Sequence, residues 1–393
     1  IDNETFEKEI KKITNSIINY DDIAIQAEIG DGSESLVHLG YQKSTQRVIA
    51  IKQFLDQTLD YQNFTFLCRQ IKMMTELNNF AILHFIGISL NPICIITEYM
   101  SNGSLYKRLH DTNQETTLSP TKRTIIGLGI AYALNYMHKK VPPILHCDVK
   151  SLNVLLDSED FPKLCDFGSS RYSTEKNDLN PGGIGTTNWM APEVIKGFEY
   201  TEKSDVYSYG VVLWELLTGK IPFEDMDITR VQNEVAYKNR RLDIQRHDCP
   251  HELRSLLSRC WSTDPKNRPT FDQIIECFEN GSVKFIGTQT DQVKAYISLF
   301  QSTSTTDQLY EFPVITDSII KSICNELDAE KEEAALKANS ILLKEENHQF
   351  VLQFNLIKSL VNAIDKCESS RFANLLMKSV DIICNYKCLI DEF

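Results

Sequence analysis

The hydrophobic pattern of this chain changes near residue 100 from one typical of strands to one typical of helices. Before that point, short runs rich in Val and Ile are separated by Gly or polar turns, as expected for strands. One segment, 61–78, instead spaces its apolar residues by three and four, which predicts a helix. After residue 100, long apolar segments at 124–140 and 204–219 predict buried helices. We therefore expect a small β-rich domain followed by a larger helical one, an α+β architecture. The predicted strands lie at 23–30, 35–40, 47–55, 84–90 and 93–100.

The N-terminus is predicted to be a helical extension. Phe6, Ile10, Ile13 and Ile17 form one apolar stripe when residues 1–20 are placed on a helix. We expect this extension, residues 1–21, to pack on the domain that follows it.

Residues 281–393 are rich in helix-forming residues and contain a weak internal repeat. The segment SIIKSICNEL at 318–327 resembles NLIKSLVNAI at 355–364. A repeat of about 40 residues predicts an armadillo- or HEAT-like stack, which could dock a partner protein. The alternative is a plain helical bundle with a chance similarity. Because such stacks need about three copies to bury a core, we expect this region to be truncated and the natural protein to continue.

The composition narrows the class of protein. The net charge of −13 argues against nucleic-acid binding. No apolar run approaches the about 18–20 residues of a membrane span. The 11 cysteines include no Cys-x-x-Cys pair, which argues against a zinc site or a disulfide framework. A reducing, cytoplasmic location fits this cysteine usage best.

A glycine-containing turn and a lysine fall on neighbouring predicted strands. The turn is IGDGSESLV at 29–37, and the run VIAIK ends at Lys52. Glycines let a hairpin approach phosphates closely, and a lysine on the next strand can pair with them. Taken alone, such a turn is weak evidence and a strand lysine usually faces solvent. Lys52, however, ends an apolar run, where a lone charge needs a partner.

Three further motifs follow in the helical part. They are HCDVKSLNVLL at 146–156, CDFG at 165–168 and MAPE at 190–193. Asp148 and Asn153 share a loop, in a spacing that suits a general base and a metal ligand. One carboxylate can orient a hydroxyl while Asn153 and Asp166 hold Mg²⁺ through oxygen. Each tetrapeptide could occur by chance, but their common order and spacing argue against it.

Together these motifs resemble the eukaryotic protein kinase domain over residues 22–280. The segments GVVLWELLTGKIPF at 210–223 and CWSTDPKNRPTF at 260–271 are similar to signatures of the tyrosine-kinase-like group of Ser/Thr kinases. The resemblance implies a bilobal kinase fold with a β-rich N-lobe at 22–100 and a helical C-lobe at 101–280. It also implies ATP and Mg²⁺ as cofactors and protein substrates as partners.

The resemblance assigns roles to single residues. Asp148 would accept the proton of the substrate hydroxyl, Lys150 would steady the γ-phosphoryl group, and Lys52 would hold the α/β-phosphates. Asn153 and Asp166 would bind Mg²⁺. The expected ATP-binding residues are Ile29, Gly30, Gly32, Val37, Ala50, Lys52, Thr97, Glu98, Met100, Leu155 and Asp166.

Two further roles are structural, and two positions bear on the acceptor. The resemblance implies that Glu193 pairs with Arg268 and that Asp205 anchors the catalytic loop.

Lys150 and Thr186 stand where Ser/Thr kinases carry lysine and threonine, whereas tyrosine kinases usually carry arginine and a different loop. The resemblance therefore favours Ser/Thr over Tyr as the acceptor.

One departure from the family pattern concerns the activation segment. Cys147 replaces the arginine that usually precedes the catalytic aspartate and binds a phosphate there. Control by phosphorylation through this contact is therefore weakened. The remaining candidate regulatory sites include Thr187. The others are Ser169, Ser170, Ser173 and Thr174.

The second departure is Gln70, which stands where a glutamate should pair with Lys52. Leu67, Gln70 and Met74 share a helical face, so we expect Gln70 to point inward. A neutral hydrogen bond is weaker than a charged one. We therefore expect a slower or more conditional kinase, with a misplaced register as the alternative explanation.

We expect a protein Ser/Thr kinase that acts in intracellular signalling. Because of Gln70, the alternative is a pseudokinase or a weakly active nucleotide-binding scaffold. A third interpretation makes residues 281–393 the main functional part and the kinase its regulator.

Overall fold

The chain divides into two compact units. The computed structural model describes residues 3–31, 35–45, 47–55, 61–111, 118–175, 187–244 and 249–304. Of these residues, 18–55 and 88–99 form a sheet unit, and the others form a helical unit.

The sheet has five strands in the order β1-β2-β3-β5-β4. The pairs β1/β2, β2/β3 and β3/β5 are antiparallel. Ile49 and Ile51 of β3 are buried, as is Ile96 of β5. The five predicted strands are confirmed, with ends that differ by a few residues. They are β1 (Ile23–Asp31), β2 (Ser35–Gln42), β3 (Arg47–Phe54), β4 (Phe85–Leu90) and β5 (Ile93–Glu98).

The predicted helix at residues 1–20 is shorter than expected. It ends at Ile13, and Thr14 Oγ1 then accepts a hydrogen bond from the backbone N–H of Ser16. Such side-chain bonds offer the backbone an alternative to the helix. The expected packing is present, because the ring of Phe6 meets the ring of Phe64 edge-on at 5.9 Å. These two helices are α1 (Asn3–Ile13) and α2 (Tyr61–Glu76).

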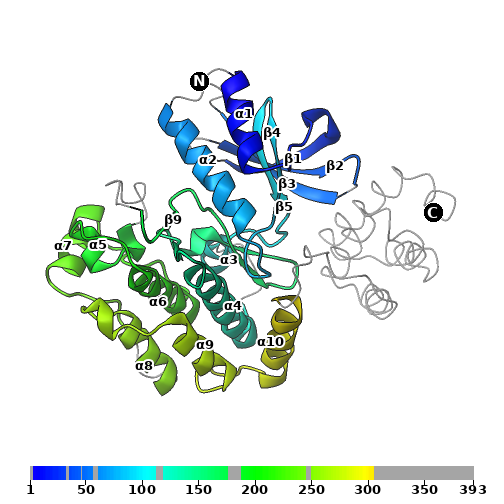
Figure 1. The fold of residues 1–393 in the computed structure, drawn as a ribbon. Helices are drawn as coiled ribbons and strands as arrows, with labels where there is room; N and C mark the ends of the chain where they lie inside the picture. Colours follow the sequence, from blue (N-terminus) through cyan, green and yellow to red (C-terminus); the bar gives the residue numbers. More distant parts are fainter. Residues whose placement is uncertain are drawn as a thin grey trace, which may run out of the picture. The chain divides into compact units, whose positions relative to one another are not determined.

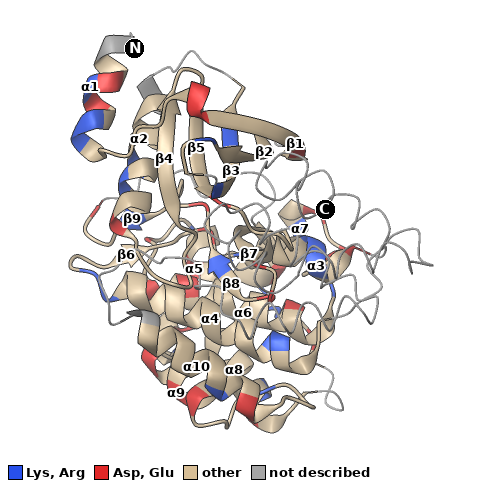
Figure 2. Ribbon diagram, turned by 90° about the vertical axis from the view of Figure 1, so that its right-hand side faces the viewer, with Lys and Arg blue, Asp and Glu red and all other residues tan. Residues whose placement is uncertain are grey.

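The helical unit is built around α4 and α6, the two long apolar helices that the sequence predicts. In Figure 1, α4 runs beside α6, α9 and α10, against which it packs. Both ribbons are largely tan in Figure 2, because few of their residues are charged. Gly219 ends α6 in the left-handed conformation, with φ 65°, which glycine adopts without strain. The remaining helices are α3 (Leu105–His110), α4 (Pro120–His138), α5 (Pro192–Ile195), α6 (Glu202–Thr218), α7 (Ile228–Ala236), α8 (His251–Cys260), α9 (Phe271–Glu279) and α10 (Thr290–Ser304).

Two pairs of short strands complete the helical unit. They are β6 (Ile144–Leu145) with β9 (Arg171–Tyr172), and β7 (Val154–Leu156) with β8 (Pro162–Leu164). Among the helices that the structure describes, none is long and apolar enough to cross a membrane.

Helix α10 belongs to the helical unit, although the sequence places it in a separate region that starts at 281. The ring of Phe300 stacks on Tyr132 of α4 with 3.8 Å between centroids, and Tyr296 lies 4.9 Å from Phe161. The repeat segments, 318–327 and 355–364, lie outside the described residues.

We predict that Phe300→Ala lowers the free energy of unfolding of the helical unit by about 3 kcal/mol, because the truncation leaves a cavity against Tyr132. Urea denaturation followed by tryptophan fluorescence measures this, since all three tryptophans lie in that unit. Leu299→Ala is the matched control, because Leu299 is 36% exposed. Equal losses in the two variants would contradict the packing role of Phe300.

Candidate functional site

Asp148 lies in the loop between β6 and β7 with one carboxylate oxygen engaged and the other available. Asn153 Nδ2 donates hydrogen bonds to the main-chain O and the Oδ2 of Asp148, both at 2.9 Å. Lys150 Nζ lies 2.8 Å from the same Oδ2. Asp148 Oδ1 is buried and has no hydrogen-bond partner among the described residues. The loop therefore orients a carboxylate whose free oxygen can accept a proton.

The buried carboxylate of Asp205, at the start of α6, holds this loop, as the sequence predicts. Its two oxygens accept the N–H groups of His146 and Cys147 at 2.9 and 3.0 Å. Its Oδ2 also lies 2.9 Å from Nε2 of His138. Burial alone would raise the pKa of Asp205, but the hydrogen bonds and the neighbouring histidines lower it below its usual value. The carboxylate stays charged, and it fixes Cys147 at φ 65°, where non-glycine residues are strained.

The CDFG motif joins the loop through the β7–β8 hairpin. The N–H of Cys165 donates to the carbonyl of Asn153 at 2.9 Å, so Asn153 and Asp166 start from the same end of the hairpin. His146 Nε2 lies 3.1 Å from the carbonyl O of Cys165, and its ring meets Phe167 edge-on at 5.5 Å. Each predicted magnesium ligand is thus fixed to the loop that carries Asp148.

These donors fit Mg²⁺ bound together with a nucleotide. Because Nδ2 of Asn153 faces Asp148, its amide oxygen is directed away from that carboxylate. One amide oxygen and the Asp166 carboxylate form a small donor set, as Mg²⁺ prefers when phosphate oxygens and water complete its shell. The described residues contain no cluster of three or more His, Cys, Asp or Glu that could hold a metal alone.

The predicted phosphate and adenine residues of the sheet unit lie in adjacent register. Gly30 is opposite Val37, Val37 is opposite Lys52, and Ala50 is opposite Thr97. Residues directly opposite one another, or two apart on one strand, share a face of a sheet. These five residues therefore occupy one face, while Ile29 lies exposed on β1 and Glu98 is buried at the end of β5. Gly32 lies outside the described residues.

The helical unit carries the other two predicted adenine residues. Leu155 of β7 packs against a small buried cluster that includes Met100, Leu83 and Cys165. Met100 and Leu155 are thus neighbours within one unit.

Of the predicted regulatory residues, Gln70 points inward as expected. It is 3% exposed, and Leu67 and Met74 are buried with it on the same face of α2. Its Oε1 has no hydrogen-bond partner within the part of the chain that the structure describes.

Among the other predicted regulatory residues, Ser173 and Thr174 are exposed and Ser169 is half-buried, whereas the rest are buried or lie outside the described part. Burial raises the pKa of the Cys147 thiol, so this thiol is protonated and unreactive. Thr187 is buried, and Ser170 is buried with its hydroxyl bonded to the carbonyl of His146. Thr186 lies outside the described residues.

Sequence reasoning missed a second buried carboxylate, Glu215 of α6. Its Oε1 accepts the hydroxyl of Ser151 at 2.6 Å and its Oε2 accepts the indole N–H of Trp189 at 2.7 Å. His110 Nε2 lies 3.3 Å from Oε1 of Glu215. Burial raises the pKa of Glu215. The sequence feature that could have revealed Glu215 is that it is the one charged residue inside the apolar run VVLWELL.

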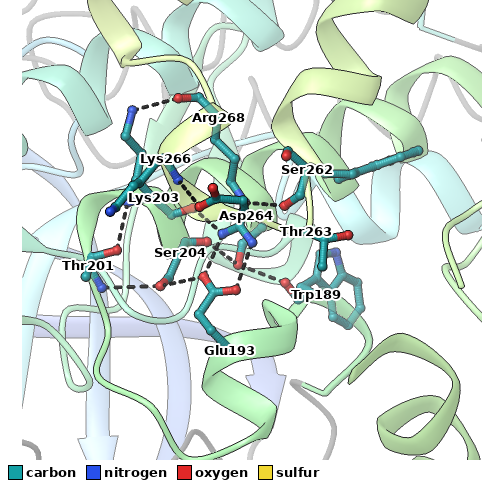
Figure 3. Close-up of polar contacts among 12 residues, drawn as sticks. Trp189, Glu193, Thr201, Lys203, Ser204, Ser262, Thr263, Asp264, Lys266 and Arg268 are labelled. Carbon is teal, nitrogen blue, oxygen red and sulfur yellow. Dashed lines mark hydrogen bonds and ion pairs between the residues drawn. The ribbon is translucent and has the colours of Figure 1, made fainter. Parts of the chain in front are cut away.

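The expected pair of Glu193 and Arg268 is present and bidentate. The guanidinium donates Nη1 to Oε1 at 2.6 Å and Nη2 to Oε2 at 2.8 Å. Figure 3 shows the two side chains facing one another, with Ser204 beside Glu193 and Ser262 beside Arg268. The pair ties the MAPE segment to the loop before α9.

Comparison with known proteins agrees with the family that the sequence motifs resemble. The family model described as protein tyrosine and serine/threonine kinase matches residues 23–278. The chain is 36% identical over 277 residues to the probable serine/threonine-protein kinase SIS8 of Arabidopsis thaliana, covering 70% of this chain and 26% of that protein. It is 35% identical over 257 residues to the serine/threonine-protein kinase CTR1 of the same plant, covering 65% and 31%. It is 35% identical over 269 residues to the dual specificity protein kinase pyk3 of Dictyostelium discoideum, covering 68% and 19%. The chain thus spans less than a third of the length of these relatives.

Proposed function

The chain belongs to the protein tyrosine and serine/threonine kinase family, and we propose that it transfers the γ-phosphate of ATP to serine and threonine hydroxyls of protein substrates. The observation that carries the proposal is the buried Asp148, with Oδ2 fixed by Asn153 and Lys150 and Oδ1 available.

The proposed chemistry uses positioning more than covalent catalysis. Asp148 Oδ1 receives the proton of the substrate hydroxyl. The hydroxyl oxygen forms a bond to the γ-phosphorus. At the same time the bond from that phosphorus to the β-phosphate oxygen breaks, and ADP leaves. Lys150 lies beside Asp148 and balances the charge of the transferred group. Lys52 would hold the α/β-phosphates. Asn153 and Asp166 would hold Mg²⁺, which neutralises the phosphate charge when bound.

The choice of acceptor rests on the catalytic loop and on the relatives. Lys150 is the residue that Ser/Thr kinases carry, and SIS8 and CTR1 are named serine/threonine kinases. Because pyk3 is named a dual specificity kinase, tyrosine transfer is the competing outcome. Incubation with [γ-³²P]ATP, Mg²⁺ and a mixed protein substrate, followed by phosphoamino-acid analysis, separates the two. Phosphotyrosine as the main product would overturn the Ser/Thr assignment.

A weakly active nucleotide-binding scaffold is the second candidate, and Gln70 is the observation that favours it. Its buried amide oxygen lacks a described partner and carries no charge. A charged hydrogen bond contributes about 1–2 kcal/mol more than a neutral one. We therefore propose a kinase whose working arrangement is less populated than it would be with a glutamate at position 70.

We predict that Gln70→Glu raises the phosphotransfer rate by about fivefold to thirtyfold, because about 1–2 kcal/mol of added preference shifts the populations by that factor. The initial rate at saturating ATP measures the change. Gln232→Glu, on the exposed surface of α7, is the matched control for added charge. If Gln70→Glu leaves the rate unchanged, Gln70 does not limit activity.

We also propose that the protein acts in a reducing compartment, such as the cytoplasm. The cysteines that the structure describes carry free thiols. A docking role for the region 281–393 is a proposal that rests on the sequence repeat alone.

A further inference from the structure

Helix α2 meets the segment that begins at the last residue of the CDFG motif, residues 168–175. Phe66 lies directly over Gly168, so closely that a methyl group on Gly168 would collide with its ring. One face of α2 therefore lies along this segment, next to the face that carries the buried Gln70.

Tyr172 makes the second contact between these elements. Its hydroxyl donates a hydrogen bond to Oε2 of Glu76. The Nζ of Lys72 lies 5.1 Å from the centroid of the Tyr172 ring, a favourable distance for a cation–π contact. Lys72 and Glu76 are one helical turn apart, so both project toward the same side chain. Tyr172 thus touches two turns of the last part of α2.

The backbone of Tyr172 connects this contact to the catalytic loop. In the β6–β9 pair, Tyr172 is opposite Ile144, and Arg171 is opposite Leu145. His146 and Asp148 follow directly on β6. Burial and the neighbouring Glu76 raise the pKa of the Tyr172 hydroxyl, so it remains a proton donor. The short β6–β9 pair therefore joins Tyr172, which contacts the end of α2, to the residues that carry the proposed chemistry.

We propose that Tyr172 is a positioning residue that holds α2 to the catalytic loop by its contacts with Glu76 and Lys72, in place of the glutamate that Gln70 replaces. The inference rests on the proposed kinase function for its effect on rate, but its structural part does not. A buried glutamine contributes only a neutral anchor. Tyr172 instead joins two charged side chains of α2, the carboxylate of Glu76 and the ammonium of Lys72, to the segment that continues from the CDFG motif.

The test removes the hydroxyl while keeping the ring. Tyr172→Phe, Glu76→Gln and the double variant are compared with the wild type by hydrogen exchange of the amides of 61–76 and by phosphotransfer rate. Each single variant should speed exchange in α2 and lower kcat by about twofold to tenfold, and the double variant should add little, because both remove one hydrogen bond. Adding Gln70→Glu to Tyr172→Phe should restore the rate. Tyr237→Phe, on an exposed side chain, is the control.

The outcomes separate the two proposals. Unchanged exchange of α2 in Tyr172→Phe would overturn the positioning role, whatever the activity. Faster exchange with no wild-type phosphotransfer would overturn the kinase proposal and leave the contact in place. A raised rate in Tyr172→Phe would also overturn the inference, because the contact would then restrain the enzyme. Additive losses in the double variant would show that Tyr172 and Glu76 act separately.

Discussion

Replacing Asp148 by asparagine should lower kcat by about 100- to 10,000-fold, the range expected for removing a general base. The amide keeps the size of the side chain and can still accept the Asn153 hydrogen bond through its oxygen. It cannot take up the proton of a substrate hydroxyl at neutral pH, and it removes the charge that faces Lys150. The loss should therefore appear in kcat and leave the KM for ATP nearly unchanged.

This prediction is checked by steady-state kinetics together with thermal unfolding. The midpoint of unfolding should stay close to that of the wild type, because Asp205 continues to hold the main chain of the loop. Asp291→Asn, on the exposed start of α10, is the control for the same chemical change. Full activity of Asp148→Asn would show that the free oxygen of Asp148 takes no part in the reaction.

The parts of the fold and site that the sequence predicts correctly depend on local pattern. The strands of the sheet follow from short Val- and Ile-rich runs, and α4 and α6 from long apolar ones. Asp148 and Asn153 are brought together because they lie five positions apart in one loop. Asp166 follows from the hairpin that connects the two motifs. In each case the residues concerned are close neighbours along the chain or are joined by a short hairpin.

The features that sequence reasoning missed or misplaced depend on contacts between distant segments. The hydroxyl of Tyr172 donates a hydrogen bond to Glu76, 96 positions away in the sequence, and the hydroxyl of Ser151 donates one to Glu215, 64 positions away. Neither spacing has a periodic signature. The end of α1 at Ile13 depends on a single hydroxyl, that of Thr14, which competes with the helix. The placement of α10 depends on aromatic rings that meet Tyr132 and Phe161, residues with no unusual sequence context.

The second large effect is expected on stability, for Arg268. Its side chain is fully buried, and it makes more contacts than the ion pair with Glu193, since Nε donates to the carbonyl of Ser262 and Nη1 to that of Lys203. Arg268→Ala leaves two carbonyls without this donor, and it leaves Glu193 with the Ser204 hydroxyl but without its counter-charge. Breaking a buried pair in this way costs about 3–5 kcal/mol, so we expect the unfolding free energy of the helical unit to fall by about that amount.

A double-mutant cycle on Glu193 and Arg268 should show that the two side chains are energetically coupled. Lysine cannot supply the planar fork that holds both oxygens of Glu193, so Arg268→Lys should recover only part of the loss. Glu193→Gln alone should destabilise the unit, because it leaves a buried guanidinium without its counter-charge. Combined with Arg268→Met it should cost less than the sum of the single changes, with a coupling of about 0.5–3 kcal/mol. Urea denaturation followed by tryptophan fluorescence measures the wild type, Glu193→Gln, Arg268→Met, their double variant and Arg268→Lys. Strict additivity would mean that Arg268 acts through its carbonyl contacts and that its charge on Glu193 adds nothing.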